Sequence, residues 1–484
     1  MRFCILAVVL SMLASPPALA QGWSGPFQLT NDTFADVNPA VCPEWVAGVT
    51  TYLVWQTNRN GNWDVYSKPC QMMPGNGWGA DKPVSIGSAD DLNPAVAACN
   101  ELAPDPASFW CVWERRESPL VGSIWASFNS SGADWQDPES VGRYIRTDGD
   151  SAKPRIIVIR DPGVDTAWVW VAWTCHDTDG WRIEYAHHAG GSWHGPYIAV
   201  TSPDPIRSAR LGRGYHDREY GCPLLTWERG GDIFYAEYVD TSWTAPAEVA
   251  HSDSLDRNPD VLSYCWMPLG LGPWITWEST RDGDTAVYGT AMDTFSIGRR
   301  WCDSTAAGNN YSPCGTPAAY TTNDWSEMAA IAWVTDRNGN SDIYAHVLSG
   351  DAYVDNNPAS DVNPTLTTLG LTQNWCVWQS DRSGNWDLFG SYVYVTGVEE
   401  NCRPQAVSFR LGPSLVRGVL SLEGNCPRTG TVLKTALLDA TGRKVADLHP
   451  GPNDVSRLAP GVYFVRAVSG KLSTVGRHKV VVQR

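Results

Sequence analysis

The feature that most constrains the fold is a pattern that recurs seven times along the 484-residue chain. In each copy an apolar run ends in Trp, a polar turn follows, and a second run ends in an aromatic residue. The pattern predicts a β-hairpin, in which Asn, Asp and Gly supply the positive φ angles of the turn. The anchoring tryptophans are Trp55, Trp113, Trp173, Trp227, Trp277, Trp333 and Trp378. An arginine stands four residues after Trp in the best copies, and its repetition indicates a structural role: Arg59, Arg281, Arg337 and Arg382.

Each hairpin is flanked by two further short strands. The preceding strand begins in four copies with Asp-x-Asn-Pro, and the following strand carries Trp-x-x-Pro or a remnant of it. A four-stranded unit repeated at about fifty residues is typical of propeller blades, because a single blade cannot bury both of its faces. The sequence therefore predicts an all-β chain, with a seven-bladed β-propeller of four-stranded blades over residues 21–396.

The two ends of this repeat region complement each other. Residues Trp23 to Thr30 match the pattern of a fourth strand but precede the first complete unit, while the last unit, ending near Val395, lacks that strand. We predict that the N-terminal strand completes the last blade. This pairing would close the ring without leaving an exposed sheet edge.

The N-terminus has the layout of a cleavable secretory signal over residues 1–20, so we expect a secreted protein. No other stretch approaches the roughly 18 apolar residues that span a bilayer. Loss of Cys4 with the signal leaves an even number of cysteines, which favours disulfides in an oxidising compartment. Local spacing offers three candidate pairs without fixing the connectivity: Cys99 with Cys111, Cys302 with Cys314, and Cys402 with Cys426.

Two hairpins carry a resemblance to a known family. The segments Ser380 to Phe389 and Asp336 to Tyr344 are similar to the blade repeats of TolB-like propellers. The resemblance covers roughly Gln21 to Thr396 and implies a fold with mainly binding roles.

A different pattern follows the repeats. Segments 436–445, 458–466 and 479–482 resemble the C-terminal sorting domain of the type IX secretion system, type A. The resemblance implies an immunoglobulin-like β-sandwich over residues 397–484 that the secretion machinery recognises. The alternative is an ordinary sandwich with no export role. The motif residues are Asp439, Gly442, Arg443, Gly461, Tyr463 and Lys479.

The Asp-x-Asn-Pro starts are one candidate binding feature, because they fall where the chain returns to the innermost strand at one mouth of the channel. The four aspartates there could bind a cation or a basic group, or they could simply cap turns. They are Asp36, Asp91, Asp256 and Asp361. Trp63 and Trp386 at the blade tops could stack on sugar rings or pack against the next blade.

Motifs for catalysis are missing from the sequence: it contains no H-E-x-x-H, G-x-S-x-G or C-x-x-C. We predict no catalytic residues, no metal site and no cofactor, with calcium at the acidic turns as the alternative. The net charge of −16 argues against a nucleic-acid partner.

We therefore expect a secreted or cell-surface, non-catalytic binding propeller with a protein or glycan ligand. The alternatives are a secreted glycoside hydrolase of the sialidase-like propeller type and a structural surface protein without a specific ligand.

Overall fold

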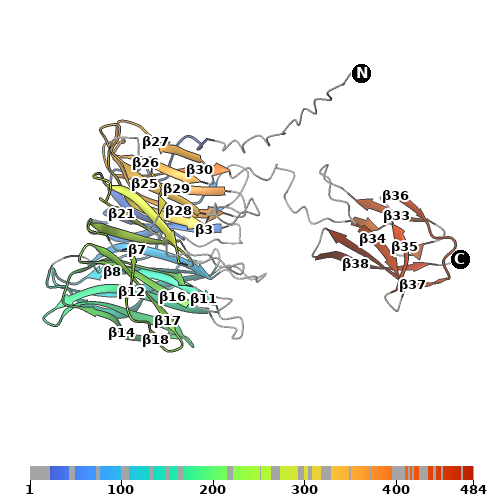
Figure 1. Cartoon of the computed structure of the whole chain (residues 1–484), viewed down its shortest axis with the longest axis horizontal. Helices are drawn as coiled ribbons and strands as arrows, with labels where there is room; N and C mark the ends of the chain where they lie inside the picture. Colours follow the sequence, from blue (N-terminus) through green and yellow to red (C-terminus); the bar gives the residue numbers. More distant parts are fainter. Residues whose placement is uncertain are drawn as a thin grey trace, which may run out of the picture. The chain divides into compact units, whose positions relative to one another are not determined.

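Every regular element in the described part of the chain is a β-strand, so the all-β prediction is confirmed (Figure 1). The computed structural model describes residues 22–42, 50–71, 77–99, 108–130, 134–148, 150, 152–160, 167–214, 222–250, 252–262, 273–292, 299–302, 308–317, 329–347, 350–369, 373–394, 409–411, 415–416, 419–424, 434–439, 443–448, 451–469 and 473–482. Within these ranges we find no helix of the length and apolarity needed to cross a membrane.

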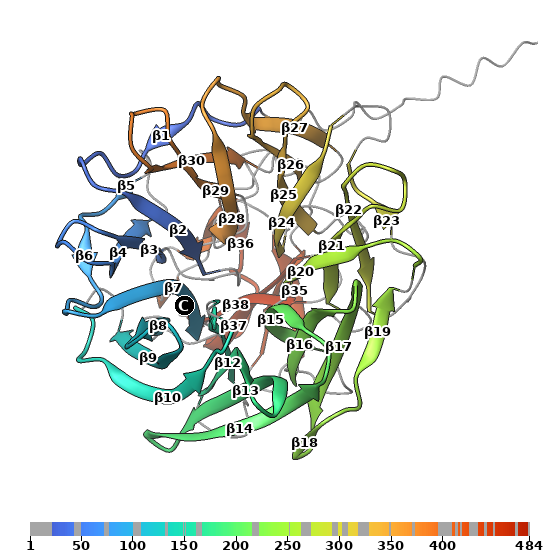
Figure 2. The same ribbon diagram turned by 90° about the vertical axis from the view of Figure 1, so that its left-hand side faces the viewer.

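The chain forms two compact units, Met1–Gly397 and Val398–Arg484. In the first unit the strands build seven sheets of four or five strands. Figure 2 shows these sheets arranged around a common centre, each with one strand innermost. The predicted β-propeller is therefore present.

The sheets follow one another along the chain, and each runs from its innermost strand outward. The first contains β2 (Asp36–Val41), β3 (Thr50–Thr57), β4 (Asp64–Gln71), β5 (Gly77–Trp78) and β6 (Lys82–Pro83). The second contains β7 (Asp90–Cys99), β8 (Ser108–Arg116), β9 (Val121–Ser130) and β10 (Glu139–Ile145). The third contains β11 (Arg155–Arg160), β12 (Ala167–Asp177), β13 (Gly180–Ala189) and β14 (Ser192–Ser202). The fourth contains β15 (Ile206–Gly214), β16 (Cys222–Arg229), β17 (Asp232–Val239), β18 (Ser242–Trp243) and β19 (Ala247–Ala250).

The remaining sheets complete the ring. The fifth contains β20 (Asp256–Leu262), β21 (Trp274–Ser279), β22 (Ala286–Ala291) and β23 (Arg299–Arg300). The sixth contains β24 (Asn310–Pro317), β25 (Ala329–Thr335), β26 (Asp342–Val347) and β27 (Gly350–Asp355). The seventh contains β28 (Asp361–Leu369), β29 (Gln373–Ser380), β30 (Asp387–Tyr394) and β1 (Phe27–Gln28).

The seventh sheet joins the two ends of the first unit. Strand β1 pairs antiparallel with β30, so that Phe27 lies opposite Gly390. The ladder continues in the Leu29 amide, which donates to the Leu388 carbonyl oxygen at 2.7 Å. The N-terminal strand thus occupies the place that the sequence predicts for it.

The core lies between neighbouring sheets. All seven anchoring tryptophans are fully buried. One apolar cluster joins Trp277 of β21 to Trp333 of β25, because the Trp-bearing face of one sheet packs against the next. The recurring arginine is also structural, as predicted: Arg59 lies 4.3 Å above the Tyr66 ring and 3.3 Å from the carboxylate of Asp36.

The described cysteines correct two of the predicted disulfides. Cys302 and Cys314 are both unbridged, because Cys302 follows the outer strand β23 whereas Cys314 lies on the innermost strand of the next sheet. Cys111 is also unbridged, since the register places it opposite Val96 rather than Cys99. The third predicted pair, Cys402 with Cys426, and the signal segment 1–20 lie outside the described residues.

The second unit contains two sheets. One consists of β31 (Phe409–Leu411), β33 (Val419–Gly424) and β36 (Gly451–Asp454). The other consists of β32 (Leu415–Val416), β38 (Ser473–Val482), β37 (Gly461–Ser469), β34 (Lys434–Leu438) and β35 (Lys444–Leu448). Both sheets contribute to one apolar cluster, which includes Leu420 and Leu437.

The described motif residues of this unit lie in or directly beside the strands of its second sheet. The Arg443 amide donates to the Asp439 carboxylate at 3.0 Å, beside the hairpin between β34 and β35. Tyr463 is buried and donates its hydroxyl hydrogen to the Ala459 carbonyl oxygen at 2.9 Å. Gly461 begins β37 and Lys479 lies in β38, while Gly442 falls outside the described residues.

Candidate functional site

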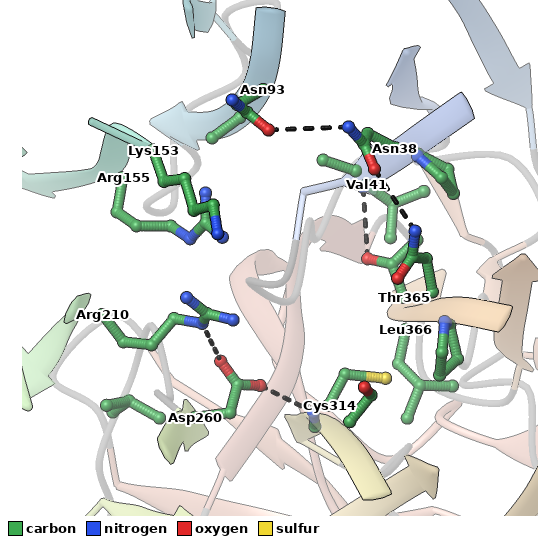
Figure 3. A pocket seen from close by; sticks show the side chains of 18 of the residues that line it. Asn38, Val41, Asn93, Lys153, Arg155, Arg210, Asp260, Cys314, Thr365 and Leu366 are labelled. Carbon is green, nitrogen blue, oxygen red and sulfur yellow. Dashed lines mark hydrogen bonds and ion pairs between the residues drawn. The ribbon is translucent and has the colours of Figure 1, made fainter. Parts of the chain in front are cut away.

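The innermost strands of the seven sheets surround a central cavity of about 430 Å³ (Figure 3). Each of β2, β7, β11, β15, β20, β24 and β28 contributes lining residues, which begin about three positions into most of these strands, and Lys153 lies two residues before β11. The cavity therefore lies toward the end of the ring where the innermost strands begin. We call this end the channel mouth.

A ring of left-handed residues marks the channel mouth. One non-glycine residue per innermost strand has φ between 48° and 53°: Asn38, Asn93, Lys153, Ser208, Asn258, Ser312 and Asn363. All of them line the cavity. In six of the strands the register with the next strand shifts at this residue, as expected for a β-bulge. Asparagine suits the position because it tolerates this conformation better than most side chains.

In several sheets the ring is fastened by the residue that follows the anchoring Trp, as Gln56 and Glu278 show. Gln56 accepts a hydrogen bond from the Asn93 amide of the next sheet at 2.9 Å. Glu278 likewise accepts from the Ser312 amide of the next sheet at 2.7 Å and from the Asn258 side chain of its own sheet at 2.8 Å. The bonds to the Asn93 and Ser312 amides run between sheets, so they fix the positions of these ring residues around the cavity.

The four predicted aspartates do not line this cavity. Asp36, Asp91, Asp256 and Asp361 are all fully buried. Asp91 receives two hydrogen bonds from Arg115 at 2.8 Å each, and Asp361 receives one from Arg382 at 2.9 Å. Burial raises the pKa of Asp361, while bonds from Ser380 and Arg382 lower it. These carboxylates are structural, and the Asn two residues later faces the cavity instead.

The predicted tryptophans Trp63 and Trp386 are half-buried at the hairpin ends. Their carbonyl oxygens accept the amides of Asp91 and Asp36, each at 2.8 Å, which fixes the start of the next sheet. In another sheet Gly231 accepts the equivalent bond, so this contact does not require an aromatic side chain.

The lining of the cavity is not symmetric. Four sheets place small or uncharged residues two positions after the bulge: Ala40, Ala95, Cys314 and Thr365. The three consecutive sheets that begin with β11, β15 and β20 place charged residues there instead: Arg155, Arg210 and Asp260. Lys153 adds a further cation on the β11 side. In a chain of net charge −16, one sector of the channel therefore concentrates basic side chains.

Within this charged sector Arg210 is partnered and Arg155 is not. Arg210 lies 3.4 Å from one Asp260 oxygen, and the Gly315 amide donates to the other at 3.0 Å. Arg155 donates to the Pro154 carbonyl oxygen at 3.0 Å and makes no ion pair with any carboxylate in the described part of the chain. Figure 3 shows the Arg155 and Arg210 head groups on the same side of the cavity, both directed into it from neighbouring innermost strands.

The electrostatics follow from this geometry. Burial, together with the neighbouring Arg210 cation, lowers the pKa of Arg155 to about 9. A guanidinium remains protonated at neutral pH, so Arg155 is a half-buried cation with no ion pair to a carboxylate among the described residues. Burial raises the pKa of Asp260, while Arg210 and the Gly315 amide lower it. An anion between the two arginines would relieve the repulsion between them.

None of the charged-sector residues was predicted as a site from the sequence. Part of the signal was present, because Lys153-Pro154-Arg155 and Ser208-Ala209-Arg210 are two of the three copies that depart from Asp-x-Asn-Pro, whereas Asp260 follows an intact copy. Where a copy departs from the repeat, its sheet can present a different side chain to the cavity from the side chains of the other sheets. No group of three or more His, Cys, Asp or Glu side chains arranged to hold a metal occurs in the ranges that the structure describes.

Comparison with known proteins gives no family for the chain: no family model matches it, and no curated protein does. Among solved structures, a protein of unknown function from Dyadobacter fermentans is 11% identical over 76% of this chain and 99% of its own, with a TM-score of 0.45. An α-L-arabinanase of Penicillium chrysogenum is 14% identical over 64% and 94%, with a TM-score of 0.42. The six-bladed propeller lectin of Aleuria aurantia is 11% identical over 68% and 96%, also at 0.42. At these identities and TM-scores the likenesses identify neither a ligand nor a reaction for this chain.

Proposed function

We propose that the protein is a non-catalytic binding propeller whose ligand carries an anionic group, bound at the channel mouth between Arg155 and Arg210. The observation that carries this proposal is the half-buried Arg155 cation, which lines the cavity without a carboxylate partner among the described residues. Arginine suits the role because its planar fork binds carboxylates in a bidentate manner. Stacking of a sugar ring on Trp63 or Trp386 belongs to the same proposal as a secondary contact.

Replacement of Arg155 by Gln is expected to weaken binding of glucuronate about 10- to 100-fold, since a hydrogen bond to a charged group contributes about 1.5–3 kcal/mol. Calorimetry on the mature chain measures this, with glucose as the uncharged ligand. Arg143→Gln is the matched control, because that arginine side chain is 70% exposed and lies outside the cavity lining.

Each outcome of that titration is informative. If glucuronate and glucose bind alike, or if Arg155→Gln binds as the natural protein does, the anion site is wrong. Release of new reducing ends from a glycoside panel would favour the second candidate, a sialidase-like glycoside hydrolase. The observation in its favour is Asp260, a carboxyl group in the cavity whose pKa burial raises toward that of a general acid.

Binding is expected to strengthen as the pH falls from neutral into the acidic range, because protonation of Asp260 releases Arg210 for the ligand. The sign follows from the raised pKa of Asp260: the carboxylate competes with the ligand above that pKa and ceases to compete below it. The facing charged groups are Arg210 and Arg155, with Cys314 on the other side. In Asp260→Asn the affinity at pH 7 should rise and its pH dependence should disappear. A pH dependence unchanged in that variant would contradict the assignment.

We further propose that the ring is a complete seven-bladed propeller of the TolB-like type, and that residues 1–20 are removed on secretion. Residues 397–484 would be an immunoglobulin-like sandwich that acts as a type IX sorting domain for a bacterial cell surface. The seven sheets and the Asp439–Arg443 hairpin support these assignments. Retention inside the cell after deletion of residues 397–484 is the test, and undiminished export would exclude the sorting role.

A further inference from the structure

A second cavity of about 400 Å³ adjoins the channel mouth on the charged sector. It shares three lining residues with the central cavity, Lys153, Ser208 and Asn258, so the two spaces meet at the ring of left-handed residues. Both volumes lie within the range of about 300–1,000 Å³ that is typical of ligand sites. We call this space the rim cavity.

The rim cavity presents its own basic side chains. Arg207 of β15 and Arg257 of β20 line it, and Arg207 is exposed and makes no ion pair with a carboxylate among the described residues. Arg257 donates to Glu278 at 2.9 Å and is therefore already engaged. Arg146 is engaged as well, because Asp148 accepts two of its hydrogen bonds at 2.9 and 2.6 Å. Arg207 in the rim cavity and Arg155 in the central cavity thus share one property: each lines its cavity without an ion pair to a carboxylate among the described residues.

Two carboxyl groups line the rim cavity, Asp150 and Glu228. Asp150 lies 3.5 Å from Arg146 and 3.9 Å from Lys153, so it engages the cations on the β11 side rather than Arg207. Burial raises the pKa of Glu228, while the Asn258 amide, Arg207 and Arg257 lower it. The Glu228 carboxyl group lies on the wall of the cavity and accepts a hydrogen bond from the Asn258 amide. The exposed Arg207 guanidinium can therefore still bind an anionic group of a ligand.

The junction between the cavities is polar and uncharged apart from Lys153. The Ser208 hydroxyl donates to the Asn258 side-chain oxygen at 2.7 Å, and both groups line both cavities. Hydroxyl and amide groups donate and accept hydrogen bonds, as the hydroxyl groups of a sugar do. A ligand that spans the junction would therefore place acid groups at its two ends and hydroxyl groups between them.

Resting on the proposed function, we propose that the two cavities are consecutive subsites for an acidic oligosaccharide, with one sugar carboxylate at Arg155 and the next at Arg207. The ligand class is then a polymer of uronic acid rather than a single sugar acid. Binding energy should increase with chain length until both subsites are filled and should change little beyond that point.

The test is a calorimetric chain-length series on the mature chain, with galacturonate, digalacturonate and trigalacturonate as probes. We expect the disaccharide to bind at least tenfold more tightly than the monosaccharide. Arg207→Gln should abolish this gain, so that the disaccharide binds no more tightly than the monosaccharide. Arg143→Gln should preserve the gain, and thermal unfolding of both variants checks that the fold is intact.

The outcomes separate the two proposals. Equal affinities for the monosaccharide and the disaccharide, or a gain that survives Arg207→Gln, would overturn the second subsite and leave the channel site standing. Failure of all three galacturonates to bind would overturn the channel site itself. A sulfated galactose disaccharide or triglutamate that binds more tightly than digalacturonate would overturn the uronic-acid assignment.

Discussion

Removal of residues 22–30 is expected to destabilise the propeller by more than about 5 kcal/mol, because it withdraws a strand from the seventh sheet and two apolar side chains from the core. Leu29 is 6% exposed within one core cluster, and Trp23 packs against another. The same segment supplies the Thr30 hydroxyl, which accepts the Leu388 amide at 2.9 Å. Guanidinium unfolding followed by tryptophan fluorescence compares chains that start at residues 22 and 31.

The truncation also exposes the outer edge of β30, which should promote edge-to-edge association visible as dimers in size-exclusion chromatography. A synthetic peptide of residues 22–30 should restore the unfolding midpoint in proportion to its concentration. The same peptide with Leu29→Ser is the matched control and should restore much less. Identical unfolding of the two chains would show that the ring does not depend on this strand for closure.

Replacement of Asp91 by Ala is expected to destabilise the propeller by about 3 kcal/mol, near the lower end of the cost of breaking a buried ion pair. Asp91 is fully buried, and its two bonds to Arg115 are direct and charge-assisted. The Arg115 side chain is 20% exposed, so water partly compensates for its lost partner. Chemical unfolding of the full chain measures the difference.

Asp90→Ala is the matched control for this variant, because Asp90 is half-buried and accepts the neutral Trp63 amide at 3.0 Å, with no ion pair to a cation among the described residues. Its loss should cost about 1 kcal/mol. If Asp91→Ala is no less stable than Asp90→Ala but loses calcium affinity that the natural protein has, the carboxylates belong to a cation site after all. Loss of stability without any change in cation binding is the result that the buried geometry leads us to expect.

The repeat made much of the fold predictable. A Trp before an Asn- and Gly-rich turn predicts a hairpin, and the structure places φ near +90° at the turn glycines Gly61, Gly283, Gly339 and Gly384. The order of strands along the chain was predictable for the same reason, since each unit repeats the previous one. The unmatched strand at Trp23 to Thr30 pointed to the pairing with β30.

Side-chain direction at the start of the innermost strand was not predictable. In a regular strand residues i and i+2 lie on the same face, so Asp36 and Asn38 would point the same way. The bulge at Asn38 breaks this alternation, which buries Asp36 near Trp55 and brings Asn38 to the cavity. The predicted pair of Cys99 with Cys111 was wrong for a related reason, because sequence spacing does not reveal which residues lie opposite each other. The register between β7 and β8 places Cys111 opposite Val96.

The hairpins, their order and the strand that completes the last sheet could be predicted from the residues alone, because they depend on neighbouring residues and on the repetition of one local pattern. The location of the candidate binding site depends instead on how the sheets close into a ring. Lys153, Arg207 and Arg257 are separated by about one repeat each, and they meet at adjoining cavities because the sheets close around an axis. The charged sector combines residues from three repeats, so it forms only when the sheets close into a ring and cannot be recognised in any single repeat.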